Sequence, residues 1–274
     1  WLFMSDAGIM ASIQFYARQL KLPTFANIDG QVRRFKAGQS LESFILELMK
    51  HEYAARQENQ LKRRIHYAKF PMVKTLEEFD LTRLQHVRPE FVKQLASCDF
   101  IKRHENVVMI GNPGTGKTHL LTAIGIKACS CGYKVMFKNA AALASQLHEA
   151  KDNYQLGKME KIIAKADLLL LDELSYASFD QDESELLFKV ISERSERTST
   201  MITTNLEFSH WTEMFANDTL TAALVDRLTY HSHIMNMNGT SYRLNDTVKH
   251  HNVSNGSRSE EHTSELQSHL MISY

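Results

Sequence analysis

The 274 residues include 43% hydrophobic and 23% charged side chains, and 32 Lys and Arg balance 32 Asp and Glu. This composition is ordinary for a globular protein and sufficient for one sizeable core plus a smaller module. No apolar run approaches the roughly 20 residues of a membrane-spanning helix, and three cysteines are too few for a disulfide framework. We therefore expect a cytoplasmic protein without a membrane partner.

The N-terminal part of the chain is predicted to be a small helical module. Apolar residues recur at helical spacing over residues 41–49, and Ser40 before them is a suitable N-cap. The pattern then turns polar and basic until Pro71 stops the helix. We assign residues 1–70 to a helical module that binds DNA or a partner, and residues 71–104 to a connector.

The pattern changes after Glu105 to strands that alternate with helices. Because these strands have few polar residues, they predict an α/β fold with a parallel sheet covered by helices on both faces. We assign this core to residues 105–252. Residues 258–269 resemble the translation of a sequencing adapter, so residues 253–274 are set aside as a disordered, artefactual tail. The expected strands are residues 106–110, 134–137, 166–171, 200–204 and 233–237.

A glycine-rich loop lies between the first strand and the helix after it. Its sequence, GNPGTGKT at residues 111–118, fits the phosphate-loop pattern G-x-x-x-x-G-K-[ST] in the required context. Glycines let backbone N–H groups turn around phosphate oxygens, and the helix presents its positive N-terminus. Lys117 is expected to reach the β- and γ-phosphates, and the Thr118 hydroxyl to hold Mg²⁺. The alternative is a glycine-rich turn that matches by chance.

The expected cofactors are therefore ATP and Mg²⁺. GTP is disfavoured because the sequence has no guanine-reading N-K-x-D motif. The candidate nucleotide contacts are Gly111, Asn112, Pro113, Gly114, Thr115, Gly116, Lys117, Thr118 and His119.

Four leucines, residues 168–171, run directly into Asp172 and Glu173. In a doubly wound sheet, ligands lie outside the carboxyl ends of the strands, so charges at a strand end can reach a bound nucleotide. Neighbouring strand residues point to opposite sides, so the two carboxylates should have different roles. We expect Asp172 to bind Mg²⁺ and Glu173 to deprotonate the attacking water. The alternative is that both are solvated residues at the start of a loop.

The same argument selects Asn205, which follows the apolar strand at residues 200–204. An amide at this strand end can hold the attacking water or sense the γ-phosphate. A turn-forming asparagine is an equally good interpretation, because Asn is common at such positions.

Four segments together resemble the AAA+ ATPases of the IstB and DnaC group, and IstB-like helpers of insertion-sequence transposition in particular. These segments are GNPGTGKTHL, LLLLDEL, TTN and ALVDRLTYHSHIMNMNGTSYR, and the likeness extends over residues 22–244. The resemblance implies a P-loop NTPase core of the AAA+ type, ATP hydrolysis, and assembly into a homo-oligomeric ring or spiral with the nucleotide between subunits.

The resemblance also implies a role for Arg227, which matches the position of the arginine finger that a neighbouring subunit inserts into the site. Such an arginine places positive charge on the transferred phosphoryl group. Arg243 is a weaker candidate for a second phosphate-sensing arginine. The alternative for Arg227 is an ion pair with Asp226 or a solvated surface position.

The partners implied by the resemblance are duplex DNA, bound without strong sequence preference, and the transposase of the same insertion sequence. Residues 50–74 carry seven Lys or Arg against two acids, which suits contact with a phosphate backbone, although a solvated helix face is an equally good interpretation. The candidate DNA contacts are Lys50, Arg56, Lys62, Arg63, Arg64 and Lys69.

Two other functions remain as alternatives. A DnaC-like helicase loader would use its N-terminal module to bind a replicative helicase. A regulatory module that binds nucleotide without hydrolysing it is disfavoured, because such a switch has no need of a water-activating Glu173.

Overall fold

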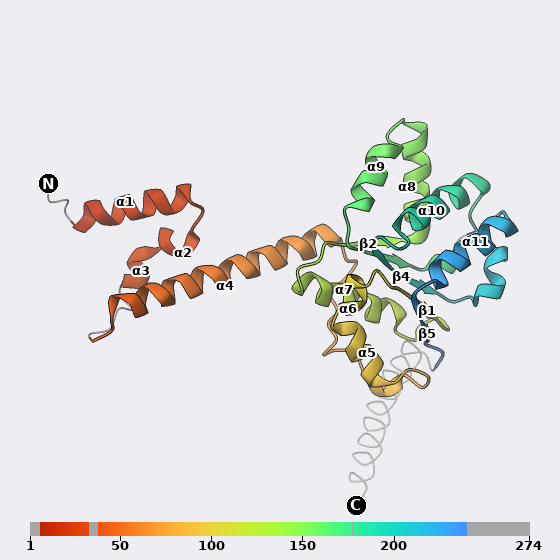
Figure 1. Ribbon diagram of the computed structural model, residues 1–274, viewed down its shortest axis with the longest axis horizontal. Coiled ribbons are helices and arrows are strands. Elements are labelled where there is room, and N and C mark those ends of the chain that lie inside the picture. The colour runs from red at the N-terminus through yellow and green to blue at the C-terminus, as the bar shows by residue number, and fades with distance from the viewer. Residues whose placement is uncertain (1–5, 33–37, 177, 240–274) are drawn as a thin grey trace, which may run out of the picture. The chain divides into compact units, whose positions relative to one another are not determined.

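The computed structural model describes residues 6–32, 38–176 and 178–239 (Figure 1). The chain divides into two compact units at the boundary between His66 and Tyr67. Arg243 and the predicted tail, residues 253–274, lie outside the described residues. Within the described part, no helix has both the length and the apolar composition needed to cross a membrane.

The N-terminal unit is helical, as the sequence predicts. Its helices are α1 (Asp6–Gln19), α2 (Pro23–Ala26), α3 (Ile28–Val32) and α4 (Leu41–Ala68), which continues past the unit boundary. The Ser40 hydroxyl accepts a hydrogen bond from the Ser43 N–H at 3.2 Å, so the predicted N-cap of α4 is confirmed.

The apolar face at the start of α4 is less buried than its periodic sequence pattern predicts. Leu48 is buried, whereas Leu41, Ile45 and Met49 are 65%, 44% and 59% exposed. The helix is amphipathic, but in a single chain most of its apolar face borders solvent.

The second unit is built on a five-stranded sheet in which every neighbouring pair is parallel, in the order β2-β3-β4-β1-β5. The predicted parallel sheet is therefore confirmed. Its strands are β1 (Asn106–Ile110), β2 (Val135–Asn139), β3 (Leu168–Asp172), β4 (Ser199–Thr204) and β5 (Ser232–Asn236). Asn139 pairs in register with Asp172, so β2 and β3 end at the same level.

Helices cover both faces of this sheet (Figure 1). They are α5 (Pro89–Ala96), α6 (Asp99–Lys102), α7 (Lys117–Ser130), α8 (Ala140–Asp152), α9 (Leu156–Ala164), α10 (Gln181–Arg194) and α11 (Asp218–Thr229). Short 3₁₀ turns occupy Leu81–Arg83, Leu174–Tyr176 and Phe208–Glu213.

The alternation of β3 explains why the leucine run is apolar throughout. Leu170 faces α7, where a Cβ at Gly125 would lie 2.6 Å from the Leu170 Cδ1 atom. Leu169 and Leu171 point the other way, into a core formed with α8, α10 and α11. Since residues two apart share a face, Asp172 follows Leu170 toward the side of α7.

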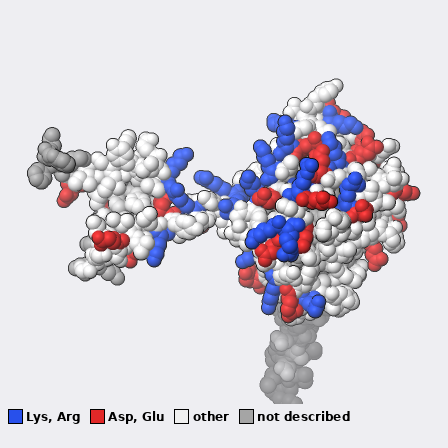
Figure 2. Space-filling view, in the orientation of Figure 1, with Lys and Arg blue, Asp and Glu red and all other residues white. Residues whose placement is uncertain are grey.

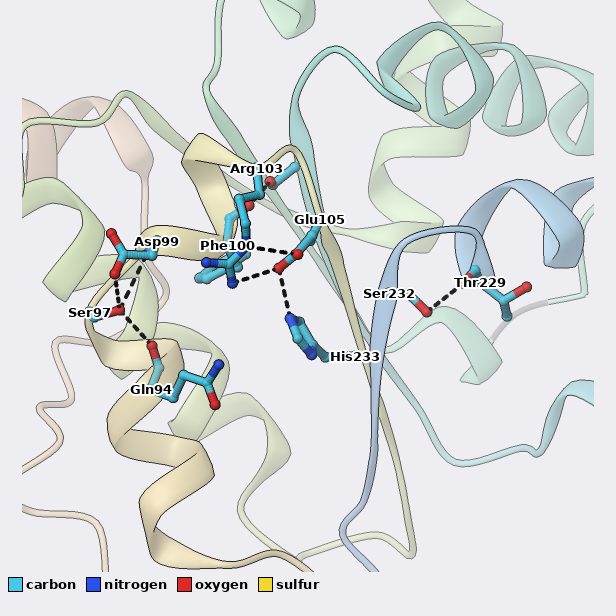
Figure 3. A network of polar contacts seen from close by, with 10 residues as sticks. Gln94, Ser97, Asp99, Phe100, Arg103, Glu105, Thr229, Ser232 and His233 are labelled. Carbon is cyan, nitrogen blue, oxygen red and sulfur yellow. Dashed lines mark hydrogen bonds and ion pairs between the residues drawn. The ribbon is translucent and has the colours of Figure 1, made fainter.

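A polar network holds the edge strand β5 beside β1 (Figure 3). The Arg103 guanidinium donates through Nε and Nη2 to the two oxygens of Glu105, at 2.8 and 2.9 Å. The His233 Nε2 atom of β5 lies 2.9 Å from Glu105 Oε2. The hydrogen bond from Arg103 holds the pKa of Glu105 below its ordinary value, so this carboxylate stays ionised and keeps both partners.

A buried arginine joins three segments beside the starts of β3 and β4. The side chain of Arg194 donates to the carbonyl oxygens of Ile163, Ala166 and Ser199 at 2.9, 3.0 and 3.0 Å, and the residue is 3% exposed. Burial lowers its pKa to about 10, so it remains charged at neutral pH.

Replacement of Arg194 by Met should therefore destabilise the fold strongly. The change removes the Arg194 hydrogen bonds to three buried carbonyl groups, and we expect the free energy of unfolding to fall by roughly 3 kcal/mol in urea titrations. Arg197→Met, an exposed position nearby, should change it by less than about 0.5 kcal/mol. Equal effects of the two variants would contradict the structural role of Arg194.

Candidate active site

The glycine-rich loop joins β1 to α7, and α7 begins at Lys117. Gly114 and Gly116 have φ angles of +80° and +90°, which side chains other than glycine rarely adopt. Gly111 is needed for a different reason, because a Cβ there would lie 2.6 Å from the carbonyl carbon of Met237. Gly114 and Gly116 are thus required by the backbone turn, and Gly111 is required by the close approach of the chain after β5.

The Lys117 side chain crosses this loop. Its Nζ atom donates to the carbonyl oxygens of Gly111 and Asn112 at 2.6 and 2.8 Å. The Asn112 N–H in turn donates to Asn238 Oδ1 at 3.0 Å. Asn238 thus anchors the loop from the segment after β5, and sequence reasoning did not identify it.

Asp172 lies next to Thr118, the predicted magnesium ligand. The Thr118 hydroxyl donates to Asp172 Oδ1 at 3.1 Å, and the Thr203 hydroxyl of β4 donates to the same oxygen at 2.5 Å. Asp172 is buried. A carboxylate and a hydroxyl at this distance are hard oxygen ligands of the kind that Mg²⁺ prefers, so these residues fit the expected metal.

Glu173 turns away from Asp172 into a different environment. Its φ angle is +59°, which is unusual for a residue with a side chain. Its N–H donates to the Thr203 hydroxyl at 2.8 Å, and its Oε2 accepts from Asn139 Nδ2 at 3.0 Å. The two adjacent carboxylates therefore have separate partners, and the left-handed backbone after the end of β3 gives Glu173 its different direction.

Asn139 is a candidate site residue that sequence reasoning missed. It ends β2 just as Asp172 ends β3, and its Oδ1 also accepts from the Ala142 N–H at 3.3 Å as the N-cap of α8. The rule that selected Asn205, a polar residue at the end of a core strand, could have found Asn139 as well.

Lys117, Thr118, Glu173 and Thr203 line one cleft of about 420 Å³, whereas Asp172 and Asn139 lie behind its lining residues as their hydrogen-bond partners. It brings the phosphate loop together with Glu173 and Asn205, whose N–H donates to Ser175 Oγ at 2.8 Å. The predicted connector also lines it, through Met72, Lys74 and Phe79.

The connector is fixed to the phosphate-loop helix by His119. The His119 Nε2 atom lies 3.1 Å from the Thr75 carbonyl oxygen, and its ring stands edge-on to Phe79 with 5.1 Å between centroids. Sequence reasoning treated this segment only as a join, but it forms one wall of the site.

Arg227 does not line this cleft. It lies on α11, where Nη1 donates to the Ala223 carbonyl at 3.3 Å and the guanidinium carbon is 4.9 Å from the centre of the Phe188 ring. Among the described residues it forms no ion pair, with Asp226 or any other acid. Arg227 is exposed, so it is accessible to a second molecule.

Two of the six predicted DNA contacts are held in ion pairs on α4. Arg56 pairs with Glu52 at 2.8 Å, and Lys62 pairs with Glu58 at 2.6 Å. Lys69 follows the end of α4 and belongs to the second unit.

Comparisons with known proteins support the resemblance. A family model described as "IstB-like ATP binding protein" matches residues 16–250. A Pseudomonas aeruginosa protein, named for ATP binding and insertion sequence IS21, is 36% identical over 206 residues, which are 75% of this chain and 78% of that protein. A Geobacillus stearothermophilus protein, named for ATP binding and insertion sequence IS5376, is 33% identical over 236 residues, which are 85% of this chain and 94% of that protein.

A solved structure supports the fold alone. AMPPCP-bound DnaA from Aquifex aeolicus is similar with a TM-score of 0.52 and 22% identity, over 62% of this chain and 51% of the DnaA chain. This likeness supports the predicted fold of the core, a parallel sheet covered by helices.

Proposed function

The chain belongs to the IstB-like ATP binding protein family, and on this premise we propose that it binds and hydrolyses ATP to assist transposition. The observation that carries the proposal is the meeting of three segments at one carboxylate. Thr118 from the phosphate loop and Thr203 from β4 both donate to Asp172 at the end of β3. This arrangement supports the proposal, because it brings a hydroxyl and a carboxylate that would hold Mg²⁺ to the loop that would hold the phosphates.

The chain's own residues divide the work of hydrolysis. Lys117 and the N-terminus of α7 bind the β- and γ-phosphates, with the Lys117 ammonium exchanging loop carbonyls for phosphate oxygens. Thr118 and Asp172 would hold Mg²⁺, and the bound ion would neutralise charge on the phosphate oxygens. Glu173 accepts the proton of the attacking water, and Asn205 orients that water from the neighbouring strand.

The connector wall is suited to the nucleoside. Met72 and Phe79 offer apolar and aromatic surface in the same cleft as the phosphate loop, and Lys74 adds a positive charge. Apolar walls with a few polar groups are typical of small-molecule sites. This part of the cleft would exclude water from one side of the bound ATP.

The relatives named for insertion sequences favour a role in transposition over a role in helicase loading. Proteins 36% and 33% identical to this chain are named for insertion sequences. The protein would act in the cytoplasm as a homo-oligomeric ring or spiral on duplex DNA and would recruit or stimulate the partner transposase. An ATPase assay with and without duplex DNA tests this setting, because a DNA-assembled enzyme should be stimulated by DNA.

Lys117→Ala tests the phosphate-loop assignment. Loss of the ammonium removes charge-assisted hydrogen bonds to the phosphates, so ATP affinity should fall by about 100-fold or more in titration calorimetry. Lys127→Ala makes the same charge change at the exposed far end of α7 and should leave affinity unchanged. Retained ATP affinity in the Lys117 variant would refute the assignment.

A further inference from the structure

The N-terminal unit contains a surface groove of about 700 Å³ between the end of α1, the start of α2 and the middle of α4. Its floor is apolar, with Ala17, Leu22 and Pro23 among the residues that line it. Four basic residues and two side-chain amides complete the lining, and no acid lies among the residues that form it. These six residues are Arg18, Lys21, Arg56, Asn59, Gln60 and Arg63.

One face of α4 supplies four of the six. Arg56, Asn59, Gln60 and Arg63 fall at i, i+3, i+4 and i+7, the spacing of a single helix face. Two helical turns separate Arg56 from Arg63, which is about 10.5 Å along the helix axis. Lys62, although adjacent in sequence, is rotated by about 100° from Arg63 and points to another side.

Arg56 fixes the groove rather than supplying free charge. Its Nε donates to Glu52 Oε1 at 2.8 Å, and its Nη2 donates to the Lys21 carbonyl at 3.2 Å. The second Glu52 oxygen accepts from the Thr24 N–H at 3.0 Å, which ties α2 to α4. Burial alone would raise the pKa of Glu52, but the hydrogen bonds from Arg56 and Thr24 outweigh it and lower the pKa, so Glu52 stays ionised.

The remaining cations of the groove are exposed and uncompensated. Arg18, Lys21 and Arg63 form no ion pair with any described residue. Figure 2 shows Lys and Arg side chains along α4 in this unit, with few acidic side chains beside them. Three like charges around one groove repel one another, and a polyanion bound there would relieve this repulsion.

We propose that this groove binds the sugar-phosphate backbone of duplex DNA, with Arg18, Lys21 and Arg63 as the phosphate contacts. The proposal rests on the proposed function and names the surface that DNA binding would use. Guanidinium groups match phosphate oxygens with paired donors, the amides of Asn59 and Gln60 add neutral donors, and the apolar floor suits deoxyribose. Contacts with phosphate and sugar carry no sequence information, so binding of the backbone in this groove would show no strong sequence preference.

The test uses the full chain and a fluorescein-labelled duplex of arbitrary sequence, with affinity measured by anisotropy at several salt concentrations. Each phosphate contact that is lost should reduce the slope of log K against log salt by about 0.9. This change is expected in each of three single variants, Arg18→Gln, Lys21→Gln and Arg63→Gln. In the triple variant the slope of log K against log salt should fall by about 2.7. At 0.1 M salt each single variant should bind roughly five- to tenfold more weakly.

The control is Arg197→Gln, which makes the same charge change at an exposed site of the other unit and should leave the slope unchanged. Circular dichroism of the triple variant should match the wild type, because all three replaced side chains are exposed. An unchanged slope in the triple variant would overturn the groove assignment. This holds even if the triple variant no longer binds an acidic protein partner, because such a loss would show that the groove binds protein and not DNA.

Two further outcomes separate the groove from the function. If Lys50→Gln and Lys62→Gln reduce the slope while the groove variants do not, DNA binding stands and the groove is the wrong surface. If the wild-type chain shows no measurable affinity for duplex DNA in the presence of ATP, the DNA-binding part of the proposed function fails, and the groove assignment fails with it.

Discussion

Glu173→Gln is expected to bind ATP as tightly as the wild type while hydrolysing it at least about 100-fold more slowly. A positioned general base contributes roughly 10²- to 10⁴-fold to such a reaction, and an amide cannot accept the proton. The substitution keeps the size of the side chain, and its amide oxygen can still accept the hydrogen bond from Asn139 Nδ2. The fold and the phosphate loop should therefore be unaffected.

Two measurements on the same protein separate binding from chemistry. Titration calorimetry should give a wild-type affinity for ATP, and phosphate release should show the loss of turnover. Glu207→Gln, which removes an exposed carboxylate just after the end of β4, is the matched control and should hydrolyse ATP normally. Near-normal turnover in Glu173→Gln would place the catalytic base elsewhere in the cleft.

The leucine run shows how far a sequence can specify a site of this kind. Residues 168–171 are apolar on both sides because helices cover both faces of the sheet, and this alone predicts a buried parallel strand. The carboxyl end of such a strand is a ligand position, so the places of Asp172 and Glu173 follow from local pattern. The contact of Asp172 with Thr118 agrees with this reasoning.

Contacts between side chains on neighbouring strands could not be predicted from local pattern alone. Asn139 reaches Glu173 only because β2 pairs with β3, and Thr203 reaches Asp172 only because β4 lies on the other side of β3. The periodicity of a strand predicts that it is buried but not which strand lies beside it.

The same limit explains why the sequence did not predict which basic residues line the groove. A charge count along α4 could not separate Arg63, which lines the groove, from Lys62, which pairs with Glu58 on another side. It also omitted Arg18 and Lys21, which join the groove from α1 and the turn after it. Charges that are distant in sequence form a surface only through tertiary packing.

Arg227 raises the question of whether one chain can complete the site. In this structure it packs over Phe188 and bonds a carbonyl of its own helix, outside the cleft that holds Lys117 and Glu173. An arginine that acts in trans must be exposed on its own subunit and free of an acidic partner, and Arg227 meets both conditions among the described residues. We expect Arg227→Ala to retain ATP binding but to lose roughly 10³- to 10⁵-fold in hydrolysis rate.

A mixing experiment tests whether that arginine is shared between subunits. Lys117→Ala chains bind ATP too weakly to fill their own sites but still carry Arg227, so in mixed oligomers they can complete the sites of Arg227→Ala chains. Random mixing in equal amounts should restore about a quarter of the sites, because each head-to-tail interface needs one intact loop and one intact arginine. Arg197→Ala, an exposed arginine on the same unit, should keep normal turnover without any partner. If mixed oligomers form, as cross-linking of differently tagged chains would show, and no activity returns, Arg227 does not act across a subunit interface.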